Sequence, residues 1–152
     1  MLQQPQNVVL RKILSDNNNI AVVGLSPKAE RPSHQVAAYL KQAGYRIIPV
    51  NPGQQEILGE VCYPDLLSVP CPVDVVDVFR RAGQIEPIVQ DAVTIGAKVI
   101  WMQQGIVNIK AAKIAEQAGL TVVMDRCIKI EHMRFAGNNA TKMFPGSKLK
   151  KN

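Results

Sequence analysis

Residues 19–34 read Asn-Ile-Ala-Val-Val-Gly-Leu-Ser-Pro-Lys-Ala-Glu-Arg-Pro-Ser-His. The stretch from Ile20 to Val23 is apolar and mostly β-branched, which predicts a buried strand that Gly24 ends. From Ser33 onward the pattern predicts a helix. A strand, a glycine turn and a helix N-terminus form the phosphate-binding corner of nucleotide-binding α/β folds. The stretch therefore predicts a phosphate site.

The loop after Gly24 lacks the G-x-G-x-x-G motif of dinucleotide-binding proteins. It carries Ser26, Pro27, Lys28 and Arg31 instead. A serine hydroxyl and two cationic side chains can bind phosphate oxygens directly, the cations through charge-assisted hydrogen bonds. We therefore expect a phosphate site of a different kind from the usual NAD site.

The end of the second predicted strand also bears on the cofactor. An NAD site usually has an acidic residue there to hold the ribose hydroxyls, whereas this chain has Asn51-Pro52. An NADP site would use a nearby arginine, but Arg46 lies inside the strand. These residues disfavour NAD and leave NADP open.

The whole chain alternates between predicted strands and helices. The strands are expected at 20–23, 45–50, 73–79, 98–102 and 120–124, and the helices at 5–16, 33–43, 84–95, 108–118 and after Cys127. Residues 54–70 are expected to be irregular, with a short helix near Asp65–Leu67. This alternation predicts an α/β, Rossmann-like, doubly wound five-stranded parallel sheet with helices on both faces. The expected strand order is 3-2-1-4-5, and the first helix is expected to be amphipathic with Val9 and Ile13 on one face.

The composition fits one folded domain. The chain has 152 residues, of which 47% are hydrophobic. It has no apolar run of the ~20 residues that a membrane helix needs, and its first residues do not resemble a signal peptide, so we expect a cytoplasmic protein. The three cysteines form no C-x-x-C pair and have no metal-ligand companions nearby, so no metal site is expected.

The formal net charge of +6 is concentrated at the C-terminal end. The tail after Gly137 contributes Lys142, Lys148, Lys150 and Lys151. We expect a domain over residues 1–137 and a flexible basic tail over residues 138–152. The tail has little aromatic interleaving beyond Phe144, so neither nucleic acid nor a membrane is the expected partner.

Ligands of doubly wound sheets bind at the carboxyl ends of the strands, and here we expect them near the switch between strands 1 and 4. The predicted strand ends carry a cation, a glycine or both. Asp125 is the only carboxylate close to a strand end, which favours binding of an anion over transfer of protons. Cys127 follows the last strand between two cations, and the sequence leaves open whether its thiol is reactive or inert.

These strand ends together resemble the CoA-binding domain family, in its small single-domain bacterial form. The matching pieces are Val22–Pro27 with Arg31, Val50–Pro52, Val75–Arg80, Trp101–Gly105 and Asp125–Ile128. The domain is similar to the N-terminal domain of the succinyl-CoA synthetase α subunit and of ADP-forming acyl-CoA synthetases. The resemblance implies coenzyme A or an acyl-CoA as the ligand and names no protein partner.

The resemblance also implies where each part of coenzyme A binds. The pyrophosphate would lie at Gly24–Lys28, the adenine near Asn51-Pro52 and the turn Val78–Arg80, and the pantetheine arm towards Gln103–Gly105 and Cys127. The expected binding residues are Gly24, Leu25, Ser26, Pro27, Lys28, Arg31, Asn51, Pro52, Val78, Phe79, Arg80, Gln103, Gly105, Cys127 and Lys129.

No catalytic residue is assigned. The chain shows no phosphohistidine segment and no ATP-grasp partner, so we expect binding without catalysis. Two alternatives stay open: an NADP-binding, oxidoreductase-like module, and the CoA-binding subunit of a multi-chain acyl-CoA ligase.

Overall fold

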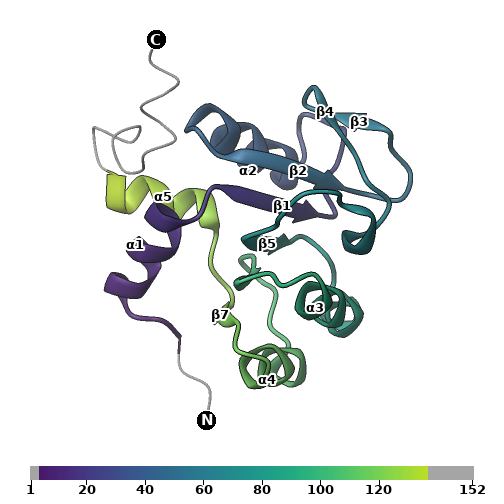
Figure 1. The fold of residues 1–152 in the computed structure, drawn as a ribbon. Coiled ribbons are helices and arrows are strands. Elements are labelled where there is room, and N and C mark those ends of the chain that lie inside the picture. Colours follow the sequence, from purple (N-terminus) through teal and green to yellow (C-terminus); the bar gives the residue numbers. More distant parts are fainter. Residues whose placement is uncertain (1–3, 137–152) are drawn as a thin grey trace.

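The computed structural model describes residues 4–136. Its centre is a five-stranded parallel sheet with the order β2-β1-β5-β6-β7 (Figure 1). The strands are β1 (Asn19–Val23), β2 (Arg46–Val50), β5 (Val75–Val78), β6 (Val99–Met102) and β7 (Thr121–Val123). The predicted doubly wound α/β fold is confirmed. The basic residues after Gly137 lie outside the described part of the chain.

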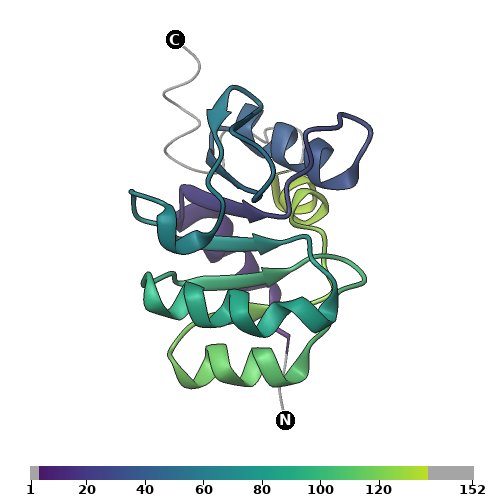
Figure 2. The ribbon, with the colours of Figure 1, turned by 90° about the vertical axis from the view of Figure 1, so that its right-hand side faces the viewer.

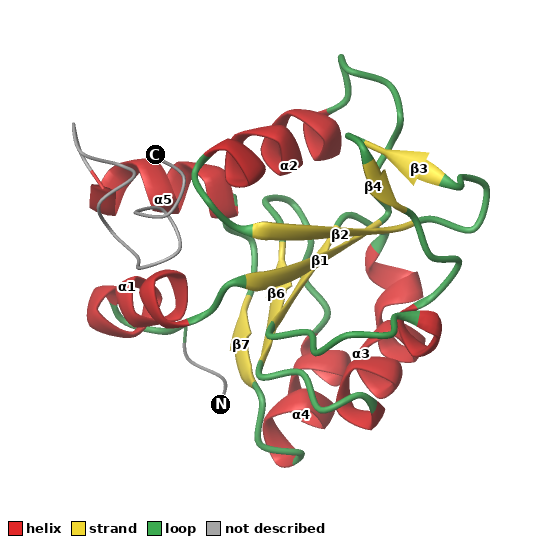
Figure 3. Cartoon of the chain, turned by 45° about the horizontal axis from the view of Figure 1, so that its top comes forward, coloured by secondary structure: helices red, strands yellow, loops and turns green. Residues whose placement is uncertain are grey.

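Helices cover both faces of the sheet (Figure 3). One face carries α1 (Asn7–Asp16), α2 (Pro32–Gln42) and α5 (Ile128–Ala136). The other carries α3 (Ile85–Thr94) and α4 (Ile109–Gln117), which lie side by side in Figure 2. None of the helices within residues 4–136 combines the length and the apolar character that a bilayer-spanning helix requires.

Each face has its own apolar core, because the parallel strands are apolar on both sides. The first helix differs from the sequence-based expectation in the side chains that face the sheet. Its side chain at Val9 is 39% exposed, whereas Leu10 is completely buried beside Ile13 and Leu14. The helix starts two residues later than expected, at Asn7, and turns Leu10 rather than Val9 towards the sheet.

The predicted strand order 3-2-1-4-5 is wrong. The third predicted strand, β5, pairs with β1 and not with β2, as Ile20 lies opposite Val75 and Val23 opposite Val78. In order of appearance the strands therefore run 2-1-3-4-5. All four residues of β5 are buried, including the acidic Asp77, which suits the middle of a sheet rather than its edge.

The connection from β2 to β5 explains this order. A strand outside β2 would need a crossover helix to cover it, but the connection has no α-helix. It forms a small antiparallel hairpin, β3 (Glu56–Ile57) and β4 (Glu60–Val61), and then the 3-10 turn η1 (Leu66–Ser68). The hairpin is another element that the sequence analysis missed. The chain then passes to the far side of β1, so the switch point lies between β1 and β5.

Candidate functional site

The site is centred on the place where β1 and β5 end beside each other. Gly24 has a φ of +89°, and its N–H group donates to the carbonyl oxygen of Val50 at 2.9 Å. A β-carbon on Gly24 would overlap the carbonyl oxygen of Phe79 and would lie 3.2 Å from Nε of Arg80. Only glycine fits this position, for conformational and for steric reasons.

The loop after Gly24 is held in place by its own polar groups. The N–H group of Ser26 donates to Oγ of Ser33 at 3.0 Å, and that of Lys28 donates to Oγ of Ser26 at 3.1 Å. His34 donates through Nδ1 to the carbonyl oxygen of Ser26 at 2.9 Å, since a carbonyl oxygen can only accept. Ser33 was not predicted as a site residue, although a serine in the first turn of a helix is a signal for such a role.

The N-terminus of α2 and the loop after Gly24 both carry backbone N–H groups that are free to bind a ligand. Pro32 occupies the first turn, and the N–H groups of Leu25, Ser33 and His34 make no hydrogen bond within residues 4–136. Unpaired N–H groups and the positive end of the helix dipole favour an anion. Lys28 and Arg31 are exposed beside them and add positive charge. The loop is therefore suited to phosphate.

Two predicted binding residues prove to support the loop. The side chain of Leu25 is completely buried, so only its backbone is available. Asn51 donates through Nδ2 to the carbonyl oxygen of Leu25 at 2.9 Å and accepts at Oδ1 from the N–H group of Gly53 at 2.9 Å. It thereby ties the end of β2 to the loop after β1, while Pro52 lies exposed beside it.

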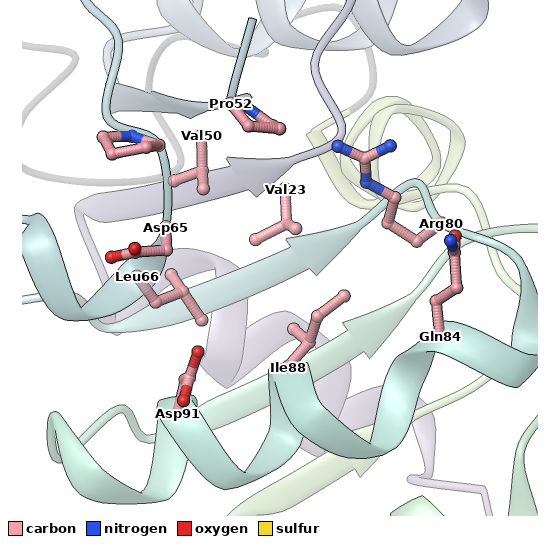
Figure 4. Close-up of a pocket in the computed structure, with 10 residues that line it drawn as sticks. Val23, Val50, Pro52, Asp65, Leu66, Arg80, Gln84, Ile88 and Asp91 are labelled. Atoms are coloured by element: carbon pink, nitrogen blue, oxygen red, sulfur yellow. The ribbon is translucent and has the colours of Figure 1, made fainter.

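A pocket of about 220 Å³ opens next to Gly24, between the ends of β1 and β2 and the helix α3 (Figure 4). Its walls include four apolar side chains, those of Val23, Val50, Leu66 and Ile88. Its polar lining comes from Arg80 and Gln84 at one end and from Asp65 and Asp91 at the other. The structure thus brings Pro52 and Arg80 together, as expected.

Several of these lining residues were missed in the sequence analysis. Asp65 and Leu66 belong to the connection that was expected to be irregular, and Ile88 and Asp91 belong to a helix that was assigned only to the core. The spacing of Ile88 and Asp91 places both on one side of α3, which is a signal that sequence reasoning could have used.

The residues after β6 and β7 are engaged in structural hydrogen bonds. Gln103 is buried and accepts at Oε1 from the N–H group of Ile128 at 3.1 Å, at the start of α5. The N–H group of Gly105 donates to Oδ1 of Asp125 at 2.7 Å. Asp125 therefore links two loops.

The structure does not bring Cys127 or Lys129 into the pocket. Cys127 is half-buried and packs against the core on the α2 side, and Nζ of Lys129 lies 5.5 Å above the ring of Tyr39. Val78 is buried in the core, so of the turn Val78–Arg80 only Arg80 lines the pocket. Within residues 4–136, no three histidine, cysteine, aspartate or glutamate side chains are grouped as metal ligands would be.

Comparison with known proteins gives a consistent result. The family model of the CoA binding domain matches residues 18–133. The uncharacterised protein YneT of Bacillus subtilis is 41% identical over 131 residues, which cover 86% of this chain and 97% of that protein. A solved structure of a hypothetical protein from Pyrococcus horikoshii is 39% identical with a TM-score of 0.86, over 90% of this chain and 99% of the other.

A more distant relative is an enzyme. The ADP-forming acetate–CoA ligase I of Archaeoglobus fulgidus is 24% identical over 129 residues, which are 78% of this chain but only 19% of the ligase. This chain therefore corresponds to one portion of that enzyme. The match over nearly all of the sheet and its helices shows that the chain belongs to the CoA-binding domain family.

Proposed function

We propose that this protein binds coenzyme A or an acyl-CoA across the ends of β1, β2 and β5. The observation that carries the proposal is the position of Arg80. Its Nε lies 3.2 Å from where a β-carbon of Gly24 would be, and the same side chain lines the pocket. Arg80 thus joins a site suited to phosphate and a pocket with apolar walls.

Each part of coenzyme A has a matching part of the site in this proposal. The pyrophosphate lies on the Gly24–Lys28 loop and the N-terminus of α2, where Ser26, Lys28 and Arg31 approach it. The adenine enters the pocket between Val23 and Ile88. The pantetheine arm runs across the sheet towards Gly105 and Cys127, which follow β6 and β7.

The proposal assigns no catalytic group to this chain. Asp125 is bonded to the backbone of Gly105, and Asp77 is completely buried in the central strand. The proposal therefore gives neither carboxylate a role in proton transfer. We propose a binding protein, acting alone or as the CoA-binding partner of a second chain.

Thermal unfolding in the presence of different ligands tests this function. A ligand that binds only the folded state raises the midpoint of unfolding. We expect coenzyme A and acetyl-CoA to raise it and NAD and ATP to leave it nearly unchanged. A rise with NADP alone would contradict the proposal and favour the oxidoreductase-like alternative.

The relationship to the ligase favours a second candidate function, that of a ligase subunit. Affinity purification of the protein from its own cells tests it. We expect a subunit to bring down a stoichiometric second chain and the pair to form acyl-CoA from CoA, acid and ATP. Recovery of the protein alone, still binding CoA, would contradict the subunit function and support a CoA-binding protein that acts without a second chain.

A further inference from the structure

The pocket beside Gly24 is chemically asymmetric. Arg80 stands at the end nearest the phosphate loop, and Asp65 and Asp91 stand at the opposite end in Figure 4. The walls between the two ends are apolar, with Val23 and Val50 from the sheet and Ile88 from α3. We therefore expect a ligand part that fills this pocket to be apolar in its middle and to present hydrogen-bond donors at the end that carries Asp65 and Asp91.

The carboxylates of Asp65 and Asp91 differ in their hydrogen bonds. Asp65 accepts at Oδ1 from both the N–H group and Oγ of Ser68, each at 2.8 Å, so the side chain is fixed in place. The carboxylate of Asp91 makes no hydrogen bond and no ion pair with any residue between 4 and 136. Burial, and then the negative charge of Asp65, raise the pKa of Asp91 above its ordinary value. The end of the pocket that carries Asp65 and Asp91 therefore offers unused acceptors.

This charge pattern decides which part of the ligand can enter. A phosphate group would be repelled by two carboxylates and has no donor to offer them. Adenine has an apolar π-face for the walls and an exocyclic amino group that donates hydrogen bonds. A volume of about 220 Å³ lies below the 300–1,000 Å³ of pockets that hold whole drug-sized ligands, which agrees with a site for one base.

We infer that Asp91, with Asp65 beside it, selects adenine over 6-oxopurines by accepting a hydrogen bond from the exocyclic amino group. In hypoxanthine an oxygen replaces this amino group, so a carboxylate that faces position 6 of the ring would meet a second acceptor instead of a donor. The loss of this hydrogen bond makes the site selective for adenine. This inference rests on the proposed binding of coenzyme A and adds the residue that reads the base.

The test compares two ligands and three proteins by calorimetry. The ligands are coenzyme A and its hypoxanthine analogue, and the proteins are the wild type, Asp91→Asn and Glu86→Gln. Glu86 is the matched control, because it lies on α3 but faces Lys110 at 3.7 Å and does not line the pocket. We expect the wild type and Glu86→Gln to prefer coenzyme A by roughly tenfold or more.

In Asp91→Asn this preference should disappear, because an asparagine amide can donate to the oxygen of hypoxanthine as well as accept from adenine. The hypoxanthine analogue should bind the variant more tightly than it binds the wild type. An unchanged preference in Asp91→Asn, or an equal loss of affinity for both ligands, would overturn the role of Asp91 while CoA binding stands. If coenzyme A fails to bind the wild type, the proposed function and this inference both fall.

Discussion

Gly24 lies so close to Phe79 that a β-carbon on the glycine would be only 3.1 Å from the carbonyl carbon of Phe79 and would overlap its oxygen. The contact joins the end of β1 to the end of β5, where Val23 and Val78 are paired. It also fixes the backbone between the phosphate loop and Arg80, which follows Phe79 directly. Stability and ligand binding therefore depend on the same backbone contact.

Gly24→Ala should weaken both properties. The new methyl group meets backbone that cannot move aside, and φ of +89° is strained for alanine, so we expect a loss of about 1–3 kcal/mol in the free energy of unfolding. Urea denaturation measures it. The matched control is Gly83→Ala, because a β-carbon at Gly83 has nothing within 4 Å. Equal stability of the two variants would contradict the steric role of Gly24.

Removal of a phosphate-binding cation should weaken coenzyme A binding without unfolding the protein. A charge-assisted hydrogen bond contributes about 1.5–3 kcal/mol, so Arg31→Ala and Arg80→Ala should each lower the affinity by roughly tenfold or more. Arg81→Ala is the control, since Arg81 is an exposed neighbour that does not line the pocket. Calorimetry measures the affinity of each variant for coenzyme A. An unchanged affinity in Arg31→Ala would show that Arg31 does not bind the ligand.

Asp77 should make the protein less stable as the pH rises. It is 0% exposed, and neither oxygen of its carboxyl group has a hydrogen-bond partner among residues 4–136. Burial raises the pKa of Asp77 well above its ordinary value. The folded state therefore holds the proton more tightly than the unfolded state. The destabilisation is absent below the unfolded pKa of about 4 and grows as the pH rises above it.

The variant Asp77→Asn removes this dependence. Its advantage in free energy of unfolding over the wild type should be small at pH 4 and should increase towards pH 7, as measured in urea. Asp16→Asn should show the opposite sign, because a hydrogen bond from Lys12 lowers the pKa of Asp16. A difference between Asp77→Asn and the wild type that is constant with pH would show that the pKa of Asp77 is the same in the folded and unfolded states.

Disulfide formation at Cys127 tests the proposed path of the pantetheine arm. If the arm ends there, the thiolate of Cys127 attacks one sulfur of oxidised CoA, forms a Cys127–CoA disulfide and releases the other CoA as a thiolate. Intact mass should then rise by one CoA in the wild type and in Cys71→Ser but not in Cys127→Ser. Cys71 precedes β5 and therefore lies towards the amino ends of the strands, whereas Cys127 follows β7. Modification that survives Cys127→Ser would contradict the path.

The strands and helices were predictable because their apolar patterns are strong and local. The order of the strands was not, because it depends on where residues 51–74 carry the chain, and that connection has no periodic pattern. The sequence placed the switch between strands 1 and 4, whereas the contact of Gly24 with Phe79 places it between β1 and β5. The strand order, and not the local sequence pattern, therefore decides which strand ends lie beside each other.

The candidate site was predictable only in part. Gly24 and Arg80 were identified from the strand ends, and the structure brings them together. Asn51 and Gln103 were assigned to the ligand, but their side chains bond to backbone groups of the protein. A sequence shows that a polar side chain follows a strand, yet not which partner it will find. Asp91 was missed because it lies in the second turn of a helix, away from any strand end.

The hairpin β3–β4 and the turn η1 occupy the connection that in many such folds is a crossover helix. They contribute no strand to the main sheet, and exposed side chains there, such as that of Asp65, take no part in the pairing of the parallel strands. The phosphate loop is different, because its glycine is locked against the backbone of β5. Evolution or protein engineering could therefore change which base is accepted through Asp65 and Asp91, while the loop that holds the phosphates stays fixed.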